Sequence, residues 1–472
     1  PRRRLERVAA VAATVLSAAV LTAILVSHTG TSGPDPSLRS PATPAERGDP
    51  AAAQKLADQA NQVSTSDPKQ ALRLLIAASV LAPDRATYRH AVARAVLDDT
   101  APAVIASRSL GAGGPVTAAA IAPDGSFVVT SRDRGQVWHT YDPAGHRTIR
   151  DPLDLDEPVT GAAASLARQG ANLIISTPAG VYGMLTSPAL TRDGARLTDP
   201  ADLVAVTVQG TVAATTTGDT ATLWRPDLFN AHVLGVLPYD RTVTSVAFAP
   251  SPDPILAAGH DDGSVTIDAI DLASESTARQ TLTASTHDAI TSVAVSADGS
   301  TVLATHANGT ATVWQATDST PRSTTTVTAP AEADGPGTHQ TWLSYQGDVA
   351  FIAGVNSAPM LWTIADGQLQ PLLNLDVHTD AAVPAMISYD GRTLVTIGRD
   401  NTLTLWDLSS IMDTIEDPLP RACPLAQITD QVWRQIAPDT AYANPCPRTG
   451  PPTLNVNTGV TTREPNASGS TR

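Results

Sequence analysis

The feature that most constrains this chain is a repeat of short apolar runs between residues 103 and 408. Each repeat holds an apolar run, a turn, a second apolar run, a polar tight turn and a third run that usually ends in an aromatic residue. Successive third runs end 42 to 48 residues apart, at Trp138, Tyr182, Trp224, Ile267, Trp314, Trp362 and Trp406. Short alternating runs of this kind predict β-strands.

The turns between the runs support an antiparallel arrangement. Asp-Gly pairs occur at 124–125, 298–299 and 390–391, and Gly takes positive φ there at no steric cost. A period of about 40 to 45 residues with four strands per unit is typical of a β-propeller. The pattern therefore predicts an all-β chain whose main domain, residues 103–408, is a seven-bladed propeller.

The ends of the repeat region predict how the ring closes. An apolar run at residues 104–110 precedes the first repeat, whereas the seventh repeat stops at Asp407, one strand short. Propellers have to protect the edges of their sheets. We therefore expect the early strand to complete the last blade.

The N-terminal residues predict a membrane anchor. Between Val8 and Val26 there is no charge, Gly or Pro, and four arginines at 2, 3, 4 and 7 precede this segment. Its length spans a bilayer, and the positive-inside rule places the basic flank in the cytoplasm. A buried Ala-rich helix of a soluble domain is the alternative. Residues 1–28 are therefore expected to form a cytoplasmic flank and a single transmembrane helix, with the propeller outside the cell membrane.

The residues between this segment and the propeller divide into two parts. Residues 29–50 are rich in Pro, Ser, Thr and Gly, which predicts an extended linker. Residues 51–100 predict two or three short amphipathic helices, with Asp67 and Asp84 as N-caps. They are loosely similar to a tetratricopeptide hairpin, but one hairpin is too short an array to bind a peptide, so a packing spacer is expected.

The last repeat carries a family resemblance. Residues 394–407, Leu-Val-Thr-Ile-Gly-Arg-Asp-Asn-Thr-Leu-Thr-Leu-Trp-Asp, resemble the closing half of a WD repeat, and residues 256–267 and 303–314 are similar but degenerate. In that family a turn Asp, a loop His, a Ser or Thr and the Trp bond one another within a blade. The resemblance implies structural roles for Asp262, Asn308, Trp314, Asn356, Trp362, Asp400 and Trp406, with His287 and His378 as candidates for the loop His. It implies a fold, not a function.

The two cysteines, Cys423 and Cys446, lie in a C-terminal appendage at residues 409–449. In an exported segment such a pair favours a disulfide. A zinc site needs more ligands, and a nucleophilic Cys needs a His, which this region lacks. With Trp433 and Tyr442 inside the loop, the appendage resembles that of actinobacterial WD-repeat proteins. Some of those carry a cytoplasmic kinase or NTPase before the membrane helix, which implies a bacterial signalling protein. Residues 450–472 are polar and predict a disordered tail.

Charge and motifs exclude several classes of function. A net charge of −15 and a pI near 5.0 argue against nucleic acid as a partner. The sequence contains no phosphate loop, nucleophile elbow or zincin motif, so no catalytic residue, metal or cofactor is expected. The sequence favours a binding or sensor scaffold for a protein or a small extracellular ligand. The alternative is a propeller enzyme of the lactonase or quinoprotein type with a site in the central channel.

A partner site is predicted on one face of the propeller. In WD-type propellers the loops that enter each first strand share a face with the loops between second and third strands. Here those loops hold Arg132, Arg134, Tyr239, Arg241, His287, His339 and Arg399. Arg and Tyr are enriched at binding hot spots. The alternative is that these are ordinary solvated loop side chains, with His287 serving inside its blade.

Overall fold

The computed structural model describes residues 49–446 apart from internal gaps. The gaps are at 98–99, 110–118, 122–126, 131–135, 140–152, 155–157, 168–169, 186–194, 226–231, 275, 285, 317–320, 327–338, 355–357, 376–384, 399–401 and 443. The expected membrane segment, nearly all of the linker and the expected C-terminal tail lie outside the described residues.

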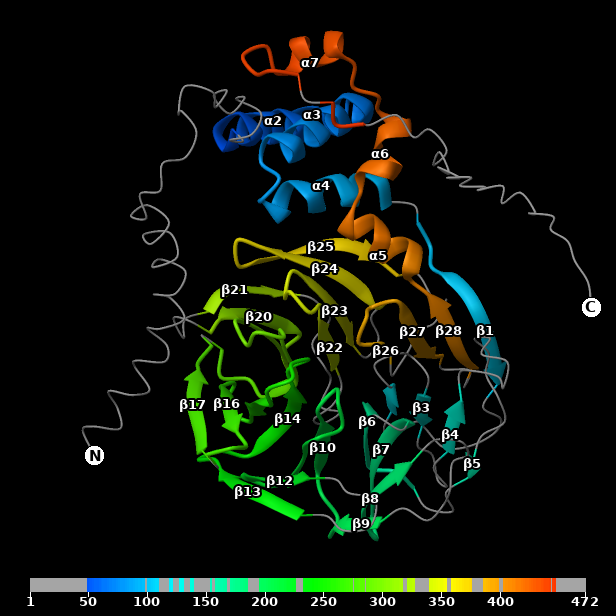
Figure 1. Cartoon of the computed structure of the whole chain (residues 1–472), viewed down its shortest axis with the longest axis vertical. Helices are drawn as coiled ribbons and strands as arrows, with labels where there is room; N and C mark the ends of the chain where they lie inside the picture. The colour runs from blue at the N-terminus through cyan, green and yellow to red at the C-terminus, as the bar shows by residue number, and fades with distance from the viewer. Residues whose placement is uncertain are drawn as a thin grey trace, which may run out of the picture. The chain divides into compact units, whose positions relative to one another are not determined.

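Most of the described chain forms antiparallel four-stranded sheets, six of which consist of four consecutive strands (Figure 1). The first three are β2 (Ala119–Ile121), β3 (Phe127–Thr130), β4 (Gln136–His139), β5 (Leu153–Asp154); β6 (Gly161–Ala167), β7 (Gly170–Thr177), β8 (Gly180–Leu185), β9 (Ala195–Thr198); and β10 (Leu203–Val206), β11 (Ala213–Thr217), β12 (Thr220–Arg225), β13 (His232–Pro238). The next three are β14 (Val243–Phe248), β15 (Ile255–His260), β16 (Val265–Asp271), β17 (Ser276–Leu282); β18 (Ile290–Val295), β19 (Thr301–His306), β20 (Thr310–Gln315), β21 (Pro321–Thr326); and β22 (His339–Leu343), β23 (Val349–Gly354), β24 (Met360–Ala365), β25 (Gln368–Asn374).

One further sheet draws its strands from both ends of the propeller. It contains β1 (Ala103–Ser109), β26 (Ala385–Ile387), β27 (Thr393–Ile397) and β28 (Thr402–Asp407), in the order β1-β28-β27-β26. Strand β1 runs antiparallel to β28, with Ala103 opposite Asp407 and Ser109 opposite Thr402. The predicted closure of the ring by the early strand is therefore confirmed.

The predicted fold class needs correction. Six blades, not seven, are continuous in the sequence, because the last repeat has only three strands of its own. Without β1 it would leave β28 as an open edge, so it is not an independent blade. The all-β class of the propeller itself is confirmed, and helices on both sides of it in the sequence build a second layer. Among the described residues no helix is long and apolar enough to cross a membrane, and the segment between Val8 and Val26 lies outside them.

The blades pack closely through small side chains on their inner strands. The middle strands β19, β23 and β27 are buried along their whole length. Gly259 in β15 shows how tight the spacing is, because a Cβ atom there would lie 2.4 Å from Ile290 of the next blade. Alternating Ala, Val, Leu and Thr therefore suit these strands better than larger residues.

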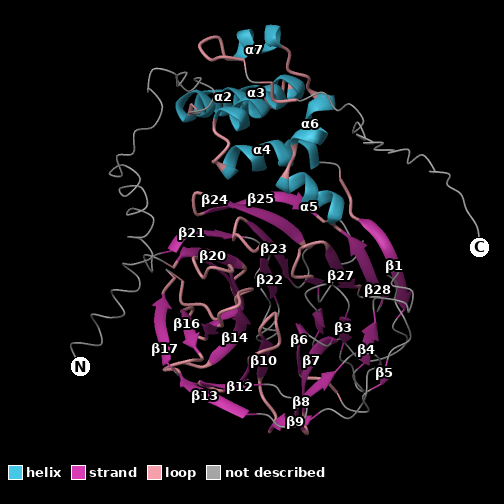
Figure 2. Cartoon of the chain, in the orientation of Figure 1, coloured by secondary structure: helices cyan, strands magenta, loops and turns pink. Residues whose placement is uncertain are grey.

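Within the described residues, three helices precede the propeller and three follow it. They are α2 (Pro50–Val63), α3 (Pro68–Leu81), α4 (Ala86–Leu97), α5 (Ser409–Glu416), α6 (Leu419–Leu425) and α7 (Asp430–Ile436). Asp49 and Asp67 each accept a backbone N–H bond at a helix start that is followed by Pro, a favourable N-terminal arrangement. Figure 2 shows these helices gathered on one side of the strands; together they are called the helical layer.

All the helices of the layer except α5 share one apolar core, built from residues on both sides of the propeller in the sequence, whereas α5 packs with propeller residues. Leu56 of α2 and Ile76 of α3 share that core with the fully buried Trp433 of α7. The Trp433 indole donates a hydrogen bond to the Thr440 carbonyl, and its ring meets Tyr442 edge-on at 5.8 Å. The C-terminal appendage is therefore a structural part of the layer.

The predicted disulfide between Cys423 and Cys446 is confirmed, with Cα atoms 5.6 Å apart, an ordinary separation for a cystine. It joins α6 to the end of the described chain and encloses α7. The bridge therefore holds Trp433 and its surroundings against α2 and α3.

Replacing both cysteines with alanine is expected to lower the free energy of unfolding by roughly 3 kcal/mol, because the bridge restricts the unfolded chain. The loss should appear in the helical layer, measured by hydrogen exchange at the Trp433 segment. Mass spectrometry of non-reduced digests of protein taken directly from cells should show the two cysteine peptides linked. Two free thiols there would contradict the assignment.

Candidate functional site

Helix α4 joins the helical layer to the sheet β22–β25. Its apolar residues divide between two cores, because Tyr88 and Val92 pack with the helical layer, whereas Ala93 and Leu97 pack with propeller residues. Each such buried side chain is worth about 1 to 3 kcal/mol in removed apolar surface. The helix is therefore held from both sides.

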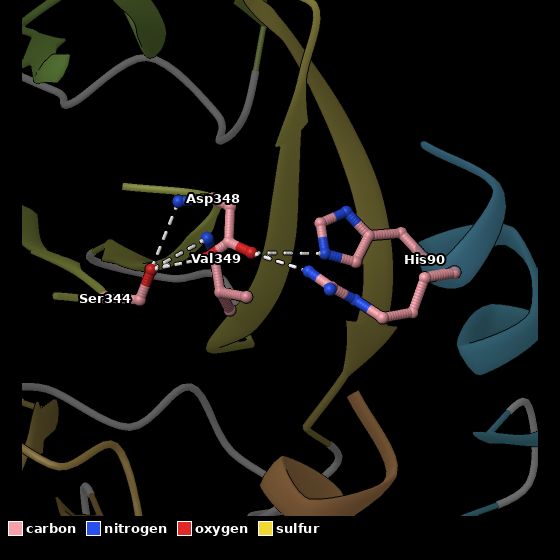
Figure 3. Close-up of polar contacts among 5 residues, drawn as sticks. His90, Ser344, Asp348 and Val349 are labelled. Atoms are coloured by element: carbon pink, nitrogen blue, oxygen red, sulfur yellow. Dashed lines mark hydrogen bonds and ion pairs between the residues drawn. The ribbon is translucent and has the colours of Figure 1, made fainter. Parts of the chain in front are cut away.

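Four polar contacts also fix how α4 is oriented against this sheet. Thr87 donates to Asp366 at 3.2 Å, Arg89 donates to Asp348 at 3.1 Å, Arg94 donates to Gln370 at 3.3 Å, and the His90 Nε2 atom lies 3.5 Å from the Asp348 carboxylate. Figure 3 shows Asp348 between His90 on one side and Ser344 on the other. One short helix thus reaches two hairpin turns of a single blade. Thr87 contacts the β24–β25 turn, and Arg89 and His90 contact the β22–β23 turn.

The turn between β22 and β23 is rigid because its side chains bond its own backbone. The Ser344 hydroxyl donates to Asp348 at 2.9 Å and accepts the N–H groups of Asp348 and Val349. Gly347 has a φ of +72°, which the turn requires. Burial by itself would raise the pKa of the Asp348 carboxyl. The His90 imidazole, 3.5 Å away, the hydrogen bond from Ser344 and the positive charge of Arg89 outweigh it and hold the pKa below its usual value.

Beside this turn lie two hollows that share Gln346 and Asp348. The larger, of about 420 Å³, is lined by Arg89, Trp342, Ser344, Tyr345, Gln346, Asp348, Val349, Tyr389, Asp390, Met412, Ile415 and Glu416. The smaller, of about 360 Å³, is lined by Thr301, Gln315, Gln346, Gly347, Asp348, Ile364, Asp366 and Gly367. Together they are called the seam groove.

The chemistry of the seam groove suits non-covalent binding. Apolar side chains of Trp342, Met412 and Ile415 lie beside carboxylates, and Tyr345 at the margin is 57% exposed. Concave sites with apolar walls and a few polar groups are the usual form of binding sites. Within the described part of the chain, no group of three or more His, Cys, Asp or Glu residues could hold a metal ion.

Comparison with known families identifies the repeats. Residues 277–315 and 369–407 match the model of the WD domain, G-beta repeat. The chain therefore contains WD repeats within a propeller of four-stranded sheets. Each match begins in the outer strand of one sheet and ends in the third strand of the next, as β17 to β20 and β25 to β28 show. No curated protein matches the chain, and a bacterial origin and a signalling role stay predictions.

The residues expected to stabilise the WD repeats do so in two ways: Asp262 and Asn308 bond the turns, and the tryptophans pack within the blades. Asp262 accepts the backbone N–H and hydroxyl of Ser264, and Asn308 accepts those of Thr310. Trp314 is fully buried and donates to the Thr283 carbonyl at 3.2 Å; Trp406 donates to Thr396 at 2.7 Å; Trp362 is 5% exposed. Asn356, Asp400 and the expected loop residue His378 lie outside the described residues.

Two histidines at strand ends bond within their blades, and the sequence predicted a structural turn at His260 but no role for His306. His306 lies 2.8 Å from the Thr312 hydroxyl and 3.2 Å from the Asp288 carbonyl, and His260 lies 2.8 Å from the Thr266 hydroxyl. Both are buried, and burial lowers the pKa of both imidazoles. His287, expected as a loop His, is exposed. The shared position two residues before a turn Asp or Asn is a signal that could have identified the pair.

The predicted partner face is described only in part. Arg132, Arg134 and Arg399 lie outside the described residues, and His339 begins strand β22. Tyr239 is buried and donates to Asp268 at 2.9 Å; burial, together with the charge of Asp268 and this bond, raises the pKa of its phenol. Arg241 donates to Asp262 at 3.0 Å. Tyr239 and Arg241 are therefore already hydrogen-bonded to residues of the blades. The partner site on this face stays a prediction.

Replacing Asp348 with Asn is expected to lower the free energy of unfolding by about 1 to 2 kcal/mol at neutral pH, because Arg89 loses a charged partner. The folded pKa of Asp348 lies below its unfolded value of about 4, so its contribution is present above that pH and is lost as pH falls further. Denaturant titrations at pH 7 and pH 3 should therefore show a smaller difference between variant and wild type at pH 3. An equal difference at both pH values would contradict the assignment.

Proposed function

We propose that this WD-repeat propeller is a protein-interaction scaffold without chemistry of its own, and that the seam groove is its docking surface. WD propellers generally bind proteins, which supports the broad function. The observation that carries the choice of surface is Tyr345. A large aromatic side chain, 57% exposed beside apolar walls, is an arrangement typical of a binding surface.

The shape of the groove favours a polypeptide segment as the ligand. Its lining comes from the ends of five blade hairpins and from α4 and α5. Two neighbouring hollows that share Gln346 and Asp348 offer successive positions for the side chains of one extended segment. A single small molecule would fill only one of them.

The groove is also prepared before binding. The Ser344 and Asp348 bonds hold the β22–β23 turn, and the contacts of Arg89 hold α4 beside it. Ordering flexible side chains and loops on binding costs free energy, so a surface that is already rigid binds its ligand at a smaller entropic cost. This rigidity supports a role in stable recognition.

The position of the groove differs from that of the loop face predicted from the sequence. The groove uses turns between first and second strands, such as β22–β23 and β26–β27. Because the strands are antiparallel, these turns lie at the opposite end of the sheets from the loops that hold Arg241 and His287. The two candidate surfaces can therefore be tested separately.

The disulfide supports a location outside the reducing cytoplasm. Bridges such as Cys423–Cys446 form and persist in oxidising compartments. A scaffold in such a compartment would meet extracytoplasmic partners.

A photoreactive phenylalanine analogue at Tyr345 is expected to form a covalent adduct with a discrete partner protein when cells that naturally make this chain are illuminated. The same analogue at the exposed His287 tests the loop face, and at Tyr442, which is 37% exposed, it tests the helical layer. Adducts at position 345 and not at 287 would support the groove. Adducts at 287 alone, or at none of the positions, would reject it.

A further inference from the structure

The charge of the seam groove indicates which partner segment it takes. We infer that the groove recognises a cationic peptide segment that bears arginine; this rests on the groove being the docking surface. Four carboxylates, of Asp348, Asp366, Asp390 and Glu416, line the two hollows against one guanidinium, that of Arg89. The lining thus has an excess of three negative charges, which favours a positively charged ligand over an anionic one.

The partners of these carboxylates leave most of that charge in place. Arg89 is engaged with Asp348 at 3.1 Å. Asp366 accepts from the uncharged hydroxyl of Thr87, and Asp390 accepts from the Ser388 hydroxyl and a backbone N–H. These bonds orient the oxygens without cancelling their charge, although the Arg392 guanidinium lies close enough to act on Asp390 as well.

Glu416 is similarly placed to meet a cation. Its side chain is 66% exposed, and its contact with Arg392 is long, at 3.6 Å. Arg392 makes its closer contact, 2.6 Å, with Asp413. Counting Arg392 and Asp413 with the groove adds one charge of each sign, so the excess of negative charge is unchanged.

Aromatic side chains among these carboxylates favour arginine over lysine. Trp342, Tyr345 and Tyr389 line the same hollow as Asp390 and Glu416. A guanidinium can stack on an aromatic ring while its N–H groups bind a carboxylate, whereas an ammonium is a more strongly hydrated point charge.

The chain uses this combination elsewhere. In the blade β14–β17 the Arg279 guanidinium lies 4.5 Å from the Tyr239 ring centre and donates to Asp268 through Nε and Nη2. There all three members belong to the protein. In the groove the ring and the carboxylate are present, and the guanidinium is the part that a partner would supply.

The inference can be tested with labelled peptides that carry two arginines at varied separations in a Gly and Ser background. The matched probes carry citrulline, which has nearly the shape of arginine without its charge, or lysine. By fluorescence anisotropy with the full chain, the best arginine peptide should bind about tenfold or more tightly than its citrulline counterpart, and more tightly than its lysine counterpart. Its binding should weaken as salt is raised.

Protein variants locate the binding in the groove. D390N/E416Q removes two charges without changing side-chain size, and Asn at 390 keeps the oxygen that the turn bonds. It should weaken the arginine peptide by about tenfold, and Y345A should also weaken it. D58N/D219N removes two exposed charges outside the groove lining and should leave binding unchanged. Circular dichroism and melting temperature verify that each variant is folded.

The outcomes separate this inference from the proposed function. Equal binding of arginine and citrulline peptides, or equal weakening by the two double variants, would overturn recognition of a cation. If adducts at position 345 still formed, the docking surface would stand and only the ligand class would be wrong. Absence of those adducts would instead reject the surface itself.

Discussion

The pairing of β1 with β28 is the contact on which the rest of the structure depends. It supplies the fourth strand of the closing sheet, whose inner strands are buried and whose outer edge would otherwise be open. It also brings the two ends of the propeller to the same sheet. Because α4 precedes β1 and α5 follows β28 at once, the helices from both ends are placed together and can bury one shared core.

The helical layer follows from that placement. Short helices such as α2 and α7 bury too little surface to be stable alone, but Leu56 and Trp433 meet in a common core. The bridge from Cys423 to Cys446 fixes the last of these helices. The layer in turn carries α4 and α5 to the ends of the hairpins, where they form part of the seam groove. Closure, helical packing and the groove are thus successive consequences of one strand pair.

The groove combines rigidity with unbalanced charge. Both carboxylate oxygens of Asp348 are engaged, one with Ser344 and the other with Arg89. The main role of Asp348 is therefore to hold the turn to α4. Asp390 and Glu416 share the more distant Arg392, and Tyr345 keeps most of its surface exposed. This division between positioning residues and available residues suits the groove to recognition, whereas the repeats by themselves specify a fold and not a function.

The sequence by itself determined the repeated strands, the Asp-Gly turns, the closure by the early strand and the cysteine pair, because each depends on local spacing or on the pairing of complementary ends. It did not reveal the roles of His306 and Arg89, whose partners Thr312 and Asp348 are chosen by packing. Nor could it show that the C-terminal appendage packs on α2 and α3. Only the tertiary structure decided the seam groove, because its walls come from segments as far apart as Arg89 and Glu416, and no local pattern encodes which distant side chains become neighbours.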